Sequence, residues 1–158
     1  MGINIRMAEI DDIEKLIEIR FDYFRAENLV ATTEQNLVVE SNLRHYIARC
    51  INSSFYAAFV EENGEIASVA FLAISERPAN IVFPTGKIGT VYNVFTYPQY
   101  RNRGYATKAM SVLIEEAKRL NLSFVELSAS ESGKPIYQKL GFKETEPSSF
   151  TPMMLSLL

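Results

Sequence analysis

The sequence holds one cysteine, Cys50, and one histidine, His45, among its 158 residues. A single cysteine cannot form an intramolecular disulfide, and this pair is too small a set for a Cys/His zinc site. We therefore expect no bound metal. A catalytic triad built on histidine would have to use His45. Both residues fall in a stretch with helical periodicity, where packing or solvent exposure is the favoured interpretation.

Long apolar runs and an excess of basic residues are also missing. No segment approaches the roughly 20 apolar residues of a membrane span, and the N-terminus lacks a basic stretch followed by an apolar run. We therefore expect a cytoplasmic protein that does not associate with a membrane. The formal net charge of −3 disfavours a general nucleic-acid binder, whose surface would be strongly basic.

The composition is that of one ordinary globular domain. Hydrophobic residues make up 47% of the chain and charged residues 22%, and this length leaves room for a sizeable core. The chain shows no internal repeat, no low-complexity run and no linker. We therefore expect a single domain over residues 1–158 whose elements share one core.

The first half of the chain predicts two helices and three strands. Asp11 followed by Glu14 is typical of a capping box, and apolar residues then recur at helical spacing. Thr32 or Thr33 can cap a second helix that ends near Asn52. The strands expected here cover residues 3–5, 55–62 and 65–75. The last two flank Asn63-Gly64, a dipeptide that favours a type I′ hairpin turn.

The second half alternates strands with helices after an irregular connection over residues 76–87, which holds two prolines and a glycine. Strand patterns cover residues 89–97 and 123–129. Helical patterns cover residues 106–120 and 130–140, the latter stopped by Gly141. Closing strands are expected from Phe142 onward and over Phe150–Leu158. These patterns predict an α/β (α+β) fold with a mixed, mostly antiparallel sheet flanked by helices.

A turn rich in basic residues lies between the strand over 89–97 and the helix that follows it. Backbone N–H groups in the first turn of a helix lack partners within the helix, and the helix dipole favours negative charge there. Gly104 and Ala106 keep side chains small, and Arg101 and Arg103 add charged donors. Their side chains could instead point to solvent while only the backbone contacts phosphate. The turn therefore predicts a phosphate site, with an ordinary basic helix start as the alternative.

Two well-known phosphate motifs, G-x-x-x-x-G-K-[ST] and G-x-G-x-x-G, occur nowhere in the chain. The turn does match [QR]-x-x-G-x-[GA] through Arg101, Gly104 and Ala106, and Pro98 precedes it. This resembles the GNAT superfamily of acyl-CoA-dependent N-acetyltransferases. Residues 128–142, which include Tyr137-Gln-Lys-Leu-Gly-Phe, look like the second signature of that family, Y-x-x-L-G-F. The predicted element order also agrees with the family across nearly the whole chain.

The resemblance implies acetyl-CoA as the co-substrate and a set of residues that would bind it. Tyr137 would be the general acid that protonates the departing thiolate, with a core aromatic as its alternative interpretation. At Ser130 and Gly133 the chain departs from the commonest pattern, Asn and Ala, which puts the cofactor hydrogen bond near Ser130 in question. The pantetheine arm would meet Val94, Phe95 and Thr96. The pyrophosphate would meet Arg101, Asn102, Arg103, Gly104, Tyr105 and Ala106.

The reaction implied by the resemblance is direct attack of a neutral amine on the acetyl carbonyl, without a covalent enzyme intermediate. A backbone N–H such as that of Val94 would stabilise the oxyanion, and proximity would supply much of the rate. Asn93 cannot usefully accept a proton but could orient the amine or a water. Glu27, Glu40 and Glu76 are candidate bases, although solvated surface carboxylates are the favoured interpretation. No general base is assigned.

Three hypotheses about function follow. The leading one is an acetyltransferase acting on a primary amine of a small molecule or a peptide or protein N-terminus. The second is a non-catalytic acyl-CoA-binding regulatory module, which the retained Tyr137 argues against. The third is a nucleic-acid-binding module using Arg101, Arg103 and Lys108, which the acidic net charge opposes. A homodimer is a weak expectation for a small enzyme.

Overall fold

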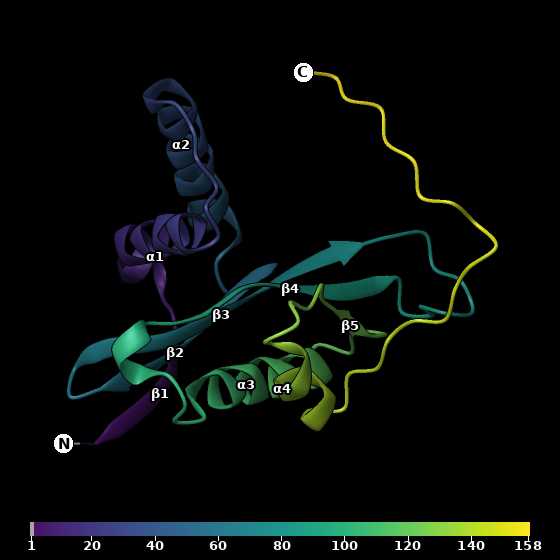
Figure 1. Ribbon diagram of the computed structural model, residues 1–158. Helices are drawn as coiled ribbons and strands as arrows, with labels where there is room; N and C mark the ends of the chain where they lie inside the picture. The colour runs from purple at the N-terminus through teal and green to yellow at the C-terminus, as the bar shows by residue number, and fades with distance from the viewer. Residues whose placement is uncertain (1) are drawn as a thin grey trace. The chain divides into compact units, whose positions relative to one another are not determined.

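The computed structural model describes residues 2–158 (Figure 1). The chain forms two compact units, one ending at Ser128 and the other running from Ala129 to Leu158. The larger unit is built on one sheet with the strand order β1-β2-β3-β4-β5. Neighbouring strands are antiparallel except β4 and β5, which are parallel. The strands are β1 (Ile3–Met7), β2 (Phe55–Glu62), β3 (Glu65–Glu76), β4 (Lys87–Thr96) and β5 (Val125–Glu126). The predicted mixed, mostly antiparallel sheet is confirmed.

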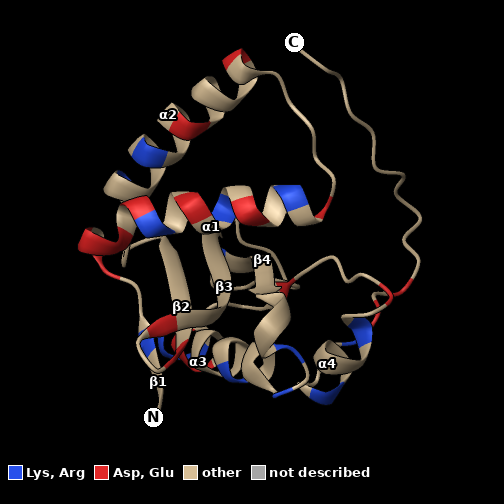
Figure 2. Ribbon diagram, turned by 60° about the vertical axis from the view of Figure 1, so that its left-hand side comes forward, with Lys and Arg blue, Asp and Glu red and all other residues tan. Residues whose placement is uncertain are grey.

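Helices cover both faces of this sheet. They are α1 (Ile13–Ala26), α2 (Thr33–Cys50) and α3 (Tyr105–Arg119), with 3-10 turns η1 (Ile10–Asp12) and η2 (Pro98–Tyr100). Figure 1 shows α1 and α3 on opposite sides of the strands. Residues 55–60 of β2 are buried without interruption, as expected for a strand covered on both faces. Charges of both signs alternate along α1 (Figure 2).

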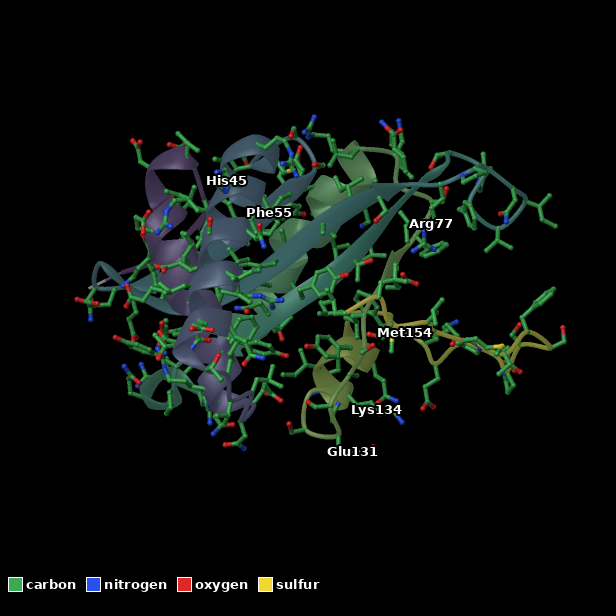
Figure 3. The ribbon with its side chains drawn as sticks, turned by 90° about the horizontal axis from the view of Figure 1, so that it is seen from above. His45, Phe55, Arg77, Glu131, Lys134 and Met154 are labelled. Carbon is green, nitrogen blue, oxygen red and sulfur yellow. The ribbon has the colours of Figure 1, made fainter. Side chains whose placement is uncertain are left out.

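The core on the α1 and α2 side is aromatic where the helices meet the strands. The ring of Phe55 packs edge-on against Tyr46 of α2 and Phe71 of β3, with centroids 5.5 Å and 5.1 Å apart. Figure 3 labels Phe55 together with His45, the neighbour of Tyr46 on α2. Leu16, Ile19 and Ile47 are fully buried in the same cluster, so apolar burial holds α1 and α2 against the sheet.

Local turn and cap chemistry behaves largely as predicted. Asn63 and Gly64 have φ angles of 53° and 83°, as a type I′ hairpin requires. Thr32, not Thr33, is the cap of α2: its Oγ1 accepts the Gln35 N–H at 3.1 Å, and its own N–H donates to Gln35 Oε1 at 2.9 Å. A predicted capping box at Asp11 and Glu14 is wrong. Because the 3-10 turn η1 precedes α1, the box lies two residues earlier.

The end of the chain differs from the prediction. Residues 142–158 contain no helix or strand, so the closing strands expected from Phe142 onward and over Phe150–Leu158 are wrong. An apolar run forms a strand only when it reaches a sheet edge, and a local pattern does not supply that edge. For the same reason β5 is two residues long instead of covering residues 123–129.

The helix of the smaller unit is also shorter than predicted. It is α4 (Lys134–Lys139), whereas the pattern indicated residues 130–140. Its first predicted turn is closed by Ser130, whose Oγ accepts the Gly133 N–H at 3.1 Å and whose carbonyl accepts the Lys134 N–H at 3.0 Å. A serine side chain that bonds to the backbone in this way favours a turn over a continuing helix.

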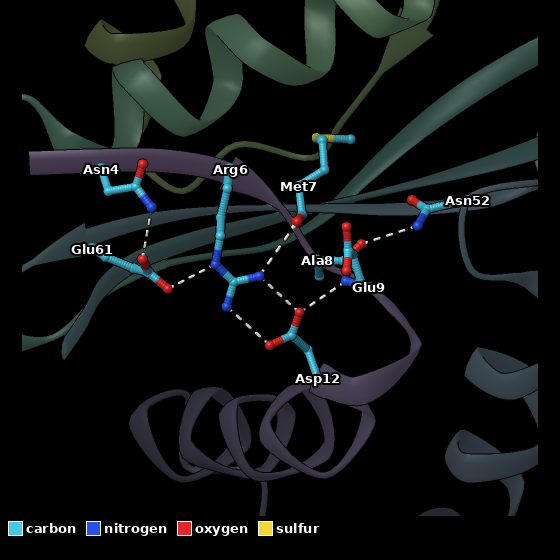
Figure 4. Close-up of polar contacts among 8 residues, drawn as sticks. All are labelled: Asn4, Arg6, Met7, Ala8, Glu9, Asp12, Asn52 and Glu61. Carbon is cyan, nitrogen blue, oxygen red and sulfur yellow. Dashed lines mark hydrogen bonds and ion pairs between the residues drawn. The ribbon is translucent and has the colours of Figure 1, made fainter. Parts of the chain in front are cut away.

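A polar cluster ties the first strand to the entrance of α1 (Figure 4). Arg6 of β1 donates to both carboxylate oxygens of Asp12, at 2.8 Å and 2.9 Å, and to Glu61 of β2 at 2.8 Å. The Arg6 guanidinium lowers the pKa of Asp12, and hydrogen bonds from Asn4 and Arg6 lower the pKa of Glu61. This cluster fixes where the chain leaves the sheet to form α1.

We predict that Arg6→Met lowers the melting temperature by about 2–8 °C, because it leaves two partly buried carboxylates without their charged donor. This corresponds to a loss of about 1–2 kcal/mol in the free energy of unfolding. The loss is modest because the Arg6 side chain is 35% exposed, and solvent weakens its ion pairs. Both folded-state pKa values lie below the ordinary ones near 4. The cluster's contribution is therefore complete above about pH 5 and is lost as pH falls through the ordinary and then the folded values.

The measurement is the melting temperature from acid to neutral pH for the wild type and the variant. We expect a shallower acid-side dependence in Arg6→Met. Arg44→Met is the matched control, because Arg44 pairs with Glu14 at 2.9 Å on the surface and surface ion pairs stabilise little. Equal losses in the two variants, or an unchanged acid-side slope in Arg6→Met, would contradict this account of the cluster.

Candidate functional site

Strand β4 is paired along only part of one edge. On the other edge it pairs with β3, but β5 meets it only at Gly89 and Thr90. No strand among residues 2–158 pairs with the β5-facing edge of β4 from Val91 to Thr96. An unpaired edge presents backbone N–H and C=O groups that an extended ligand can pair with.

A glycine marks the place where β4 and β5 are still in contact. A Cβ atom on Gly89 would lie 2.7 Å from Leu72 Cδ1 and 3.0 Å from Leu122 Cδ1. These distances are shorter than ordinary contacts, so a larger residue here would have to displace leucine side chains between β3 and the segment that leads into β5. The close approach holds the two parallel strands together at Gly89 and Thr90, after which they separate.

A β-bulge interrupts the pairing of β4 with β3 beside this open edge. Val69 lies opposite Phe95 and Phe71 lies opposite Tyr92, so Asn93 and Val94 both face Ala70. Asn93 has a φ of 54°, a left-handed conformation that asparagine tolerates better than most residues. Bulges are common next to active sites, where they re-aim side chains.

The side chain of Asn93 is buried and only partly satisfied. It is 3% exposed, its Oδ1 accepts a hydrogen bond from Arg20 Nη1 at 3.2 Å, and its Nδ2 has no hydrogen-bond partner. A buried donor without a partner is costly and calls for a functional explanation. Of the two predicted catalytic residues, Asn93 and Tyr137, Asn93 is therefore the one with a buried, unpartnered donor that a substrate could use.

The basic turn lies at the start of α3, as predicted. Gly104 is the N-cap residue with a φ of 76°, and a Cβ atom there would meet nothing within 4 Å. The backbone hydrogen bonds of the turn leave the N–H groups of Arg103 and Gly104 without an acceptor in the described chain. These donors and the N-terminus of α3 form an open site suited to an anion.

The arginine side chains of the turn are engaged by the protein itself. Arg101 Nε donates to the carbonyl of Thr96 at 3.1 Å. Arg103 forms a two-oxygen ion pair with Glu62 at 2.8 Å and 2.9 Å, and the Tyr105 hydroxyl donates to the same carboxylate at 2.9 Å. Both side chains brace the turn, which favours anion binding by the backbone N–H groups.

Within the smaller unit, Tyr137 lies in α4. Its ring packs edge-on against Phe142, with centroids 6.1 Å apart. A Cβ atom on Gly133 would lie 3.1 Å from Tyr137 Cε2 and 3.2 Å from Ser130 Oγ. Glycine at this position therefore leaves room for the tyrosine ring.

A cavity of about 260 Å³ lies between α1, α2 and the sheet. It is lined mainly by aromatic and aliphatic side chains, and Arg20 of α1 is the one charged residue of the lining. Arg20 was not among the predicted site residues. The signal that could have found it is its place on the apolar stripe of α1, four residues after Leu16 and four before Phe24.

Other candidate residues do not gather at this site. His45 is exposed and its Nδ1 lies 2.9 Å from the carbonyl of Ser41, and Cys50 is buried as a free thiol. The candidate bases Glu40 and Glu76 pair with Arg44 and Lys87, and Glu27 is exposed.

Among residues 2–158 no group of three or more His, Cys, Asp or Glu side chains could hold a metal ion. No helix in this part of the chain is long and apolar enough to cross a membrane.

Solved structures share this fold. A crystal structure of a predicted acetyltransferase with acetyl-CoA from Clostridium acetobutylicum has a TM-score of 0.83 and 28% identity, covering 97% of this chain and 96% of that chain. A GCN5-related N-acetyltransferase from Ralstonia eutropha has a TM-score of 0.77 at 24% identity, covering 96% of this chain and 99% of that chain.

The sequence comparisons agree. An uncharacterized N-acetyltransferase of Archaeoglobus fulgidus is 25% identical over 126 residues, which are 79% of this chain and 80% of that protein. Residues 13–142 match the model of the acetyltransferase (GNAT) family, a range that includes the open edge of β4, the turn before α3 and Tyr137. The chain therefore belongs to the GNAT family and is an N-acetyltransferase.

Proposed function

We propose that this enzyme transfers an acetyl group directly from acetyl-CoA to a primary amine of a small molecule or of a peptide or protein N-terminus. The observation that carries the proposal is the arrangement of β4: its unpaired edge leads, through η2, directly into the open anion site at the start of α3. One continuous stretch of backbone thus offers the unpaired groups of a strand edge, followed by N–H donors suited to phosphate.

The residues present fit the two ends of a CoA molecule. The unpaired edge at Val94, Phe95 and Thr96 can pair with the amide groups of the pantetheine arm, as an added strand would. The N–H groups around Gly104 can donate to the pyrophosphate oxygens, since no protein atom lies within 4 Å of where a Cβ atom of Gly104 would be. We also propose that residues 1–158 form a single N-acetyltransferase domain.

Acetyl-CoA supplies an activated acetyl group as a thioester. The enzyme's task is to hold the amine against the acetyl carbon, so that a C–N bond forms while the C–S bond breaks. The Val94 N–H, freed by the bulge from the regular register with β3, would stabilise the developing oxyanion. Tyr137 would give its proton to the departing sulfur and regain one from solvent, and Ser130 would contact the cofactor nearby.

The structure adds a constraint on the role of Asn93. Its Oδ1 already accepts from Arg20, and an amide nitrogen is a donor that cannot accept a proton. The free Nδ2 would therefore donate to a substrate atom or a water and position it, while the proton of the attacking amine leaves by another route.

Acetyl-CoA binding and turnover test the proposal directly. A ligand that binds only the folded state raises the free energy of unfolding by mass action, by about 2.7 kcal/mol at a concentration 100 times its dissociation constant, and so raises the melting temperature. We expect acetyl-CoA and desulfo-CoA both to raise it, and acetyl-CoA with a panel of primary amines to release free thiol. Calorimetry that detects no binding of millimolar acetyl-CoA would remove the proposal.

We predict that Gly104→Ala weakens acetyl-CoA binding by at least about tenfold, because its methyl group enters the space between the N–H groups and the pyrophosphate. Gly64→Ala is the matched control. Gly64 also has a positive φ, 83°, and open space around its Cα, but it lies in the β2–β3 hairpin. Both variants should lose similar stability, about 1–2 kcal/mol of left-handed strain, and only Gly104→Ala should lose affinity. Equal dissociation constants for the two variants would move the phosphate site elsewhere.

We predict that Tyr137→Phe keeps acetyl-CoA affinity within a few-fold and lowers kcat by about 100-fold, the low end of general acid catalysis. The ring that packs against Phe142 remains, so packing should be preserved. Tyr56→Phe is a control for losing a tyrosine hydroxyl, because that group donates to the Asn52 carbonyl at 3.2 Å. Single-turnover rates are the measurement, since slow product release could mask the effect. A Tyr137→Phe rate within twofold of wild type would leave Tyr137 a structural aromatic.

A further inference from the structure

The cavity between α1, α2 and the sheet has the size and lining of a small-molecule site. Its aromatic walls come from four elements: Tyr46 of α2, Phe55 of β2, Phe71 of β3 and Tyr92 of β4. Phe55, labelled in Figure 3, packs edge-on against two of the other rings. A volume of about 260 Å³ lies just below the usual range for drug-sized ligands, roughly 300–1,000 Å³. The cavity therefore suits a small, largely apolar molecule.

Arg20 places a positive charge in this apolar cavity without a counter-ion. Its guanidinium lies over the Phe24 ring at 4.6 Å and donates through Nη1 to Asn93. No Asp or Glu among the described residues forms an ion pair with it. Burial lowers the pKa of Arg20, yet an arginine stays protonated in a protein.

Two other arginines of the larger unit, by contrast, form ion pairs with carboxylates. Arg6 pairs with Asp12 and Glu61, and Arg103 pairs with Glu62. A partly buried cation without a partner costs stability, and an anionic ligand would offset that cost. Four of the five guanidinium N–H donors of Arg20 have no hydrogen-bond partner in the described chain. A planar fork with free donors matches the two oxygens of a carboxylate.

The hydrogen bond from Arg20 to Asn93 connects this cavity to the segment of β4 where we propose that acetyl transfer takes place. Asn93 lies in the bulge of β4, and the next residue is Val94, which faces the acetyl group in the function proposed above. An acceptor bound by Arg20 at the cavity therefore lies beside the segment of β4 that would hold the thioester.

We propose that the acceptor is a small primary amine that carries a carboxylate and an apolar or aromatic body, as an apolar α-amino acid does. Arg20 binds the carboxylate and the aromatic cavity takes the body. The inference rests on the proposed function of β4. The amine nitrogen bonds to the acetyl carbon as the C–S bond breaks, its extra proton passes to solvent, and the thiolate takes a proton. The products are the N-acetylated acid and CoA.

The test uses ligand pairs that differ only in the carboxylate. L-phenylalanine is compared with 2-phenylethylamine, and L-leucine with 3-methylbutylamine, first by calorimetric binding to the enzyme saturated with desulfo-CoA and then by thiol release from acetyl-CoA. We expect the carboxylate-bearing member of at least one pair to bind about 10- to 100-fold more tightly, the range for hydrogen bonds to charged groups.

Three variants assign this preference to Arg20. Arg20→Met should abolish the preference, mainly through KM, while Arg20→Lys should keep part of it because it retains the charge but not the fork. Arg25→Met is the matched control on the same helix. The Arg25 side chain is 68% exposed and pairs with Asp22, so its loss should leave the preference intact.

The outcomes separate this inference from the proposed function. If desulfo-CoA does not bind, the function of β4 itself is wrong. If desulfo-CoA binds but neither amino acid binds at millimolar concentration, or each binds no better than its decarboxylated partner, the carboxylate site is wrong and the acetyltransferase proposal stands. A preference that survives in both Arg20 variants would also overturn the assignment.

Discussion

The separation of β4 from β5 after Thr90 is the constraint on which the rest of the site depends. Inside a sheet, every backbone N–H and C=O group of a central strand is normally paired. Here the pairing with β5 stops after two residues, so the N–H and C=O groups farther along this edge are open to a ligand. The parallel connection through α3 places the N-terminus of that helix just beyond the open segment. A strand edge and a helix terminus, each with unused donors, thus follow one another along the chain.

Such a site needs support from the surrounding structure, because its groups are not satisfied by the fold. The Glu62 carboxylate at the end of β2 holds Arg103 and Tyr105 and so fixes the turn before α3. On the other side of the sheet, Arg20 holds Asn93 in the bulge. The two strained or unsatisfied features, the left-handed Asn93 and its unpaired Nδ2, are of the kind that cluster at functional sites. The turn before α3 and the cavity beside Arg20 are therefore both held by side-chain contacts to the sheet.

The features that could be predicted from the sequence are those set by neighbouring residues. The hairpin at Asn63-Gly64 and the cap at Thr32 follow from short-range turn chemistry, and the basic turn before α3 follows from its place between a strand and a helix. Phe150–Leu158 was predicted as a strand from its apolar character alone and forms none, because pairing depends on a partner elsewhere in the chain. The place of Arg20 on the apolar stripe of α1 indicates burial, but its contact with Asn93 spans 73 residues, and no local pattern predicts that partner.

Backbone amide hydrogen exchange with and without desulfo-CoA tests the central claim most directly, because the claim concerns N–H groups that the protein itself leaves unpaired. The account predicts that the ligand slows exchange at Val94, Thr96, Arg103 and Gly104, while the β1–β2 amides, already paired within the sheet, change little. Bound ligand with unchanged exchange at both the β4 edge and the turn before α3 would contradict it.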